Sequence, residues 1–192
     1  SFTMVSVTKG TDSYTAVRAS VARAALLGID AVDIEDDGHD FVRSVPTEEL
    51  DDLKPKGAAK RHEFDPRVTD SLDEALRYFL MSTAARRVRG KGNRHATALV
   101  HTSQHIDVHE RTAEAIRDHL GRLSRRLQRG DDVLLEALRA QWETECDRVP
   151  AGDFDLNALS WDDIAGALIE VAEAAEVIVD NSRSPERLSF DD

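Results

Sequence analysis

The chain has 192 residues, 41% of them hydrophobic and 32% charged, which fits one sizeable domain with a packed core and argues against a disordered chain. Cys146 is the single cysteine, so an internal disulfide is excluded and a cytoplasmic setting is expected. No apolar run approaches the length of a membrane span, so no membrane contact is expected, and the formal net charge of −12, considered alone, argues against nucleic acid.

The first third of the chain predicts a strand, a helix and an acidic segment. Residues 4–8 are typical of a short strand, and apolar residues then recur at helical spacing from Tyr14 to Ala24, before Gly28. Residues 31–45 alternate around an Asp-Asp-Gly turn and predict a hairpin, although an acidic surface loop fits them too. Pro46 precedes a short acidic helix, and residues 54–68, with two prolines, predict a loop or linker.

Residues 71–89 carry the clearest helical pattern in the chain. Ser71 and Glu74 have the spacing of a capping box, and the arginines of the last turns favour the negative end of the helix dipole. Gly90 and Gly92 are expected to end the helix. The predicted apolar stripe consists of Leu72, Ala75, Leu76, Phe79, Leu80, Thr83 and Val88.

The second half predicts strands and helices in alternation. Residues 96–100 and 176–181 are short apolar runs typical of buried strands, and residues 187–190 suggest a third. Between them, a helix is expected from Asp107, another is capped by Asp131 or Asp132, and a third starts where Ser160 and Asp163 have capping spacing. The apolar stripe of the first of these helices consists of Ala113, Ile116, Leu120, Leu123 and Leu127.

This order predicts an α+β fold that is predominantly helical, with a parallel βαβ element and helical material inserted in its crossover. We expect residues 1–68 to form an N-terminal helix, acidic hairpin and linker. Residues 69–192 are expected to form the helical and βαβ core, and the whole chain is expected to be a fragment of a larger protein.

Positive charge is concentrated in the middle of the chain. Between Arg86 and Arg129, eleven Lys or Arg residues and four Asp or Glu residues give a net +7, so the remainder carries −19. The basic residues around Gly90 and Gly92 suit phosphate, because glycines allow close approach and arginines bind phosphate through two donors. They equally suit a helix end that is simply solvated. A second basic group, Arg122, Arg125, Arg126 and Arg129, is open to the same two interpretations.

Catalytic and metal motifs are weak. His105 and His109 are four residues apart, but the intervening glutamate of a zinc-protease helix is missing, and a role at a helix end is simpler. Ser103 lacks the glycine-flanked turn of a hydrolase nucleophile. The acids of residues 33–40 could hold Mg²⁺, but no lysine pattern completes a nuclease site, and no phosphate-binding loop motif is present. No metal site is therefore assigned.

The segment SLDEALRYFLMSTAARRVRGKGNRHATALVHTSQHIDVH, residues 71–109, resembles the Z1 domain, an endonuclease-associated domain of bacterial restriction-modification and phage-defence proteins. The matching residues in its helix are Ser71, Leu72, Ala75, Phe79, Leu80, Ala85, Arg86, Arg89 and Gly90. Those after the helix are His95, Leu99, Val100, His101, Thr102 and Ser103. Flanking segments, including WDDI and VIVDNSRSPERLSF, are similar as well.

The resemblance implies a helicase-like parent protein with two RecA-like lobes acting on DNA, of which this chain would be a part. It implies ATP and Mg²⁺ for the full-length protein and none for this fragment, because the motor motifs are missing here. The partners would be DNA, the remaining lobes of the parent, or a second copy of the chain. The predicted phosphate-binding residues are Arg86, Arg89, Lys91, Arg94, His95, His101 and Ser103. The alternative hypothesis is a helical protein-interaction or oligomerisation module without affinity for nucleic acid.

Overall fold

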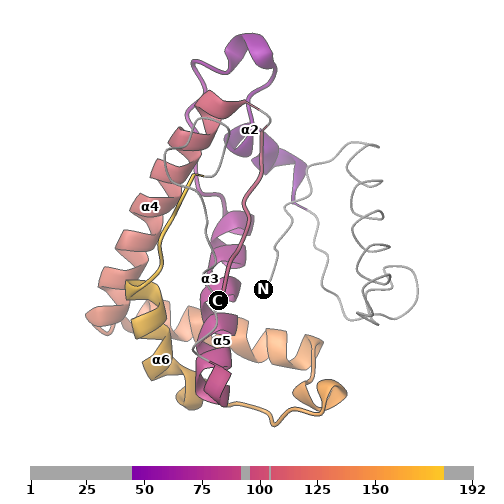
Figure 1. Cartoon of the computed structure of the whole chain (residues 1–192), viewed down its shortest axis with the longest axis vertical. Helices are drawn as coiled ribbons and strands as arrows, with labels where there is room; N and C mark the ends of the chain where they lie inside the picture. Colours follow the sequence, from indigo (N-terminus) through magenta and orange to yellow (C-terminus); the bar gives the residue numbers. More distant parts are fainter. Residues whose placement is uncertain (1–44, 92–95, 104, 180–192) are drawn as a thin grey trace.

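The computed structural model describes residues 45–91, 96–103 and 105–179, and this part of the chain is built from helices (Figure 1). The longer helices are α3 (Asp70–Arg86), α4 (Ile106–Gln128), α5 (Asp132–Arg148) and α6 (Trp161–Glu173). Shorter elements are α2 (Leu50–Leu53), the 3-10 turns η1 (Thr47–Glu49), η2 (Ala58–Lys60) and η4 (Ala151–Phe154), and the π-helical turn η3 (Arg87–Lys91).

The predicted βαβ element, which the family resemblance implied to be RecA-like, is wrong for the part of the chain that the structure describes, because none of those residues forms a strand. Residues 96–100 and 175–179 run as irregular segments without a ladder of backbone pairing. Their apolar residues have another use, since Val100 and Val177 pack on helical side chains. The apolar runs are therefore neither paired as strands nor fully buried: Val100 and Val177 are partly buried, whereas Leu99 is 55% exposed and Ile178 is 39% exposed. The predictions for residues 1–44 and 180–192 lie outside the described residues.

The helix ends follow local hydrogen bonds that the sequence partly revealed. Ser160 and Asp163 form the predicted capping box of α6, and Asp131 caps α5 by accepting a bond from the amide of Leu134. The predicted box at Ser71 is wrong. Thr69 caps α3 instead, and its hydroxyl accepts from the amide of Leu72 at 3.4 Å.

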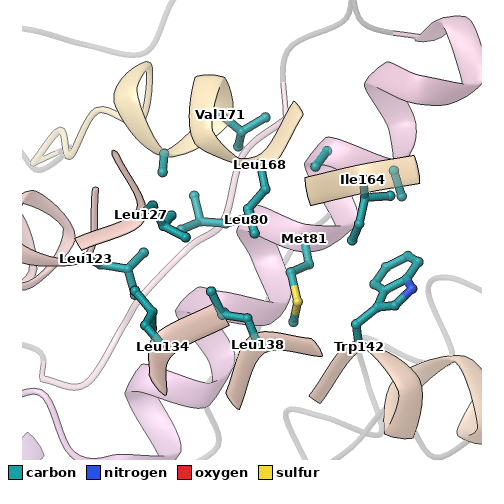
Figure 2. Close-up of a cluster of buried hydrophobic side chains, with 13 residues drawn as sticks. Leu80, Met81, Leu123, Leu127, Leu134, Leu138, Trp142, Ile164, Leu168 and Val171 are labelled. Atoms are coloured by element: carbon teal, nitrogen blue, oxygen red, sulfur yellow. The ribbon is translucent and has the colours of Figure 1, made fainter. Parts of the chain in front are cut away.

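Two apolar clusters hold the helices together. The larger, here called the main core, gathers side chains of α3, α4, α5 and α6, among them Leu80, Leu127, Leu138 and Ile164 (Figure 2). The smaller, here called the upper core, joins Leu53 of α2 to Leu72, Leu76 and Ile116. Side chains as buried as Leu80 and Ile164 each contribute about 1.5–3 kcal/mol relative to an exposed position.

Helices α3 and α4 each contribute to both clusters and thereby set the shape of the molecule. The predicted stripe of α4 is confirmed: Ala113, Ile116, Leu123 and Leu127 are buried, and Leu120 is partly buried. Val88, assigned to the stripe of α3, is instead 40% exposed, because α3 ends and η3 begins before it.

Among the described residues, the structure has no helix that meets the length and apolarity of a membrane span.

Candidate functional site

In the predicted basic loop after α3, Arg89 makes a hydrogen bond within the fold. Arg89 donates from Nη2 to the backbone oxygen of Asn157 at 3.1 Å. Burial raises the pKa of the nearby Cys146 thiol, and the positive charge of Arg89 opposes that rise. Arg89 thus ties η3 to the segment before α6. Arg86 is half-buried in the last turn of α3.

In the rest of the predicted loop, the structure describes the turn at Gly90 but not the basic side chains. Gly90 has a φ of 73°, in the left-handed region that glycine tolerates, and it turns the chain there as predicted. Lys91 ends η3, and its side chain, like Arg94 and His95, lies outside the described residues. The role of these residues in phosphate binding stays a prediction.

The predicted His101 and Ser103 lie together just before α4. Ser103 is buried, and its hydroxyl accepts a bond from the amide of His105 at 3.1 Å. His109 donates from Nε2 to the carbonyl oxygen of Ser103 at 2.7 Å, and its ring centroid is 6.0 Å from that of His101. Ser103 therefore shapes the start of α4. His105 precedes the helix, so His105 and His109 do not share a helical face.

A contact that sequence reasoning missed holds the same end of α4 to the loop before α3. Arg111 donates to the carbonyl oxygens of Arg61, His62 and Phe64, with distances of 3.0 Å to His62 and 2.7 Å to Phe64. Asp107 lies 3.3 Å from Arg61 and 3.2 Å from His62. Every residue has a backbone carbonyl group, so the sequence does not indicate which carbonyls accept a hydrogen bond, and only the fold shows this clamp.

Among the described residues, no three His, Cys, Asp or Glu side chains gather as metal ligands would.

The opposite end of α4 presents the second basic group of the sequence. Four exposed arginines lie in the last two turns and at the residue just after them, and they are here called the arginine patch: Arg122, Arg125, Arg126 and Arg129. Because α4 buries Ile116, Leu123 and Leu127, residues at positions 122, 125 and 129 fall on the face away from the core. Positive charge at this end also favours the helix dipole.

Most of the charge of the arginine patch is not neutralised locally. Arg126 pairs with Asp131 at 2.7 Å, and this bond raises the pKa of Arg126 and lowers the pKa of Asp131. Within the described part of the chain, no ion pair involves Arg122, Arg125 or Arg129. Three guanidinium groups thus face solvent on a chain whose overall charge is −12.

A groove of about 320 Å³ lies beside the arginine patch, between α4 on one side and the end of α6 with the chain after it on the other. Its wall on α4 consists of Arg117, Leu120, Gly121, Ser124, Arg125 and Gln128. The opposite wall consists of Ala172, Glu173, Ala175 and Val177. The groove is held by two bonds: Gln128 donates to Glu173 at 2.5 Å, and Arg117 donates to the carbonyl oxygen of Val177 at 3.2 Å. Arg125 belongs to both the groove and the patch.

Comparison with known proteins gives one match. No curated protein and no solved structure matches this chain. The model of the Z1 domain family does match, over residues 71–192. That range is more than half of the chain, and it contains α3 from its second residue, α4 with its arginine patch, both walls of the groove and the predicted basic loop. The chain therefore belongs to the Z1 domain family.

Proposed function

We propose that this chain binds DNA through the arginine patch of α4 and serves as a scaffold and polyanion-binding part of a DNA-processing Z1 protein. The observation that carries the proposal is the row of exposed arginines at the end of α4, three of them outside any ion pair among the described residues. The proposal extends the sequence-based hypothesis of a basic phosphate-binding surface, and it adds α4 to the loop around Gly90.

The spacing of the patch suits a phosphate backbone. Seven residues separate Arg122 from Arg129, which is about 10 Å along a helix axis. One DNA strand places about three phosphates in that length. Each guanidinium can bind a phosphate through two parallel donors.

The charge elsewhere on the chain supports a contact confined to this area. With a net charge of −12 overall, most of the surface repels a polyanion, so an approaching DNA is directed to the positive end of α4. In this proposal, Arg86 stays a predicted second contact, whereas Nη2 of Arg89 is already bound to the carbonyl oxygen of Asn157. ATP, Mg²⁺ and any strand cleavage are assigned to the full-length protein on the strength of the family resemblance alone.

Binding of a labelled oligonucleotide, followed by fluorescence anisotropy, tests the proposal. We expect binding at low salt that weakens steeply as salt rises, with a slope of log K against log salt near −3 for about three phosphate contacts on duplex DNA. Replacing Arg122, Arg125 and Arg129 with Glu should weaken binding at least about tenfold and flatten this slope.

A matched variant distinguishes the effect of the arginine patch on affinity from the effect of net charge. Lys56→Glu, Lys60→Glu and Arg139→Glu alter three exposed cations by the same total charge at other places on the surface. This variant should keep most of the affinity. The proposal is wrong if the wild-type chain shows no binding at low salt, or if the patch variant binds as tightly as the matched variant.

A second candidate function is protein interaction, and exposed apolar side chains favour it. Val133 is 77% exposed on the first turn of α5, and Leu99 is 55% exposed in the segment before α4. Single exposed apolar residues are common on protein surfaces, so this observation is weaker than the arginine patch. Stable dimers by light scattering, together with no affinity for oligonucleotides, would favour this candidate.

A further inference from the structure

Two neighbouring surfaces on α4 differ in chemistry. The arginine patch presents only cations, whereas the groove next to it combines apolar, amide, hydroxyl and carboxylate groups. Arg125 stands at the boundary and contributes to both. Such a pair of surfaces corresponds to the two parts of a nucleotide, a charged phosphate and an uncharged base with hydrogen-bonding edges.

The groove itself is a poor site for phosphate. The carboxylate of Glu173 lines it, and it lies at the carboxyl end of α6, where the helix dipole is negative. The groove suits a base better. Leu120 and Val177 offer apolar contact, and the hydrogen-bonded pair Gln128 and Glu173 offers an amide and a carboxylate to base edges.

We propose that the groove takes one nucleoside of a single-stranded nucleic acid whose phosphates lie on the arginine patch. This inference rests on the proposed function and names the form of nucleic acid that it concerns. In a duplex the bases are stacked and paired, so none can enter a groove beside a helix without the cost of being flipped out. An unpaired strand presents its bases freely, and the guanidinium planes of Arg117 and Arg125 can stack on them.

The size of the groove limits how much of the strand it holds. Its volume of about 320 Å³ is at the lower end of the range for ligand pockets, which begins at about 300 Å³. That volume suits one nucleoside. The remaining contacts of the strand would be backbone contacts along α4, which carry no sequence information, so binding is expected to be tolerant of sequence.

Gly121 allows the groove to be filled without removing a charge. A Cβ at this position would meet only the end of the Arg125 side chain, at 3.4 Å. Gly121→Leu therefore projects a side chain into the groove, and because glycine is unfavourable inside a helix, the exchange should not weaken α4. Gly166→Leu on α6 is the matched control, since a Cβ there meets nothing within 4 Å and Gly166 does not line the groove.

Anisotropy titrations with a single-stranded oligothymidine and with a duplex of equal length test the inference. The wild-type chain should prefer the single strand. Gly121→Leu should weaken single-strand binding about tenfold, and it should leave duplex binding within about twofold, as set by phosphate contacts. Gly166→Leu should behave as the wild type in both titrations.

The outcomes separate this inference from the proposed function. If the wild-type chain binds both forms equally, or if Gly121→Leu binds the single strand as tightly as Gly166→Leu does, the groove inference fails while the patch proposal stands. If neither form binds, both fail. Should Gly121→Leu not fold, Gln128→Ala decides, because it removes the amide that bonds to Glu173 and should also weaken single-strand binding alone.

Discussion

Asp73 is the centre of a half-buried ionic cluster between α3 and α4. Its Oδ1 is 2.6 Å from Nε2 of His119, and its other oxygen pairs with Arg77 on the next turn of α3. Burial by itself raises the pKa of Asp73, but the hydrogen bond to His119 and the charge of Arg77 outweigh that effect, so the pKa lies below its ordinary value of 3.8. The ionised form of Asp73 therefore stabilises the folded chain.

Asp73→Asn should lower the free energy of unfolding by about 2 kcal/mol near neutral pH, because it removes charge-assisted hydrogen bonds. The folded chain lowers the pKa of Asp73, so this stabilisation is complete well above pH 3.8 and is lost as the pH falls through the folded-state pKa. Urea unfolding of both proteins at about pH 7 and about pH 3 checks the effect, and the difference between them should shrink at the lower pH.

Glu143→Gln is the matched control for this change. Glu143 pairs with Arg139 at 3.0 Å, but both side chains are more than half exposed, so the loss should be small at both pH values. A difference between wild type and Asp73→Asn that stays constant with pH would show that Asp73 does not act through its charge.

At the scale of single elements, the starts of α5 and α6 could be predicted from the sequence because the groups involved are close in the chain. A cap such as Ser160 with Asp163 needs only four consecutive residues and one turn of helix. The predicted strands failed for a different reason. A strand forms only when its backbone pairs with a second strand. Within the described residues, Val100 and Val177 pack on helical side chains, and the two runs do not pair with each other.

Ser160→Ala should lower the free energy of unfolding by about 1 kcal/mol, because the amide of Asp163 loses its acceptor at the start of α6. Thr144→Ala is a suitable control, since Thr144 is exposed inside α5 and alanine favours a helix at least as well. Thermal unfolding followed by circular dichroism measures both. Equal melting temperatures for the two variants would contradict the capping role of Ser160.

At the scale of the whole molecule, contacts between distant residues could not be predicted from the sequence. The clamp of Arg111 joins residues 47 to 50 positions apart, and all three of its acceptors are backbone carbonyls. The candidate interface was partly predictable: the four arginines of α4 stood out as a group. Only the fold showed that Arg89 serves an internal contact while Arg122, Arg125 and Arg129 face solvent.

Arg111→Lys should release the loop around residues 61–64, because an ammonium cannot reproduce the planar donors that reach three carbonyl groups. Amide hydrogen exchange in this loop should speed up about tenfold, while α5 and α6 keep their protection. Arg122→Lys, at an exposed position of the same helix, should change neither region. Unchanged exchange in the loop of Arg111→Lys would contradict the clamp.

The length of α4 keeps its two ends apart. Arg111 at one end and Arg129 at the other are eighteen residues from each other, or about 27 Å along the axis. An oligonucleotide seated on the arginines would leave the histidine-rich end uncovered. In the proposed function, binding at the arginine patch therefore leaves the contacts of Arg111 with the loop at residues 61–64 unchanged.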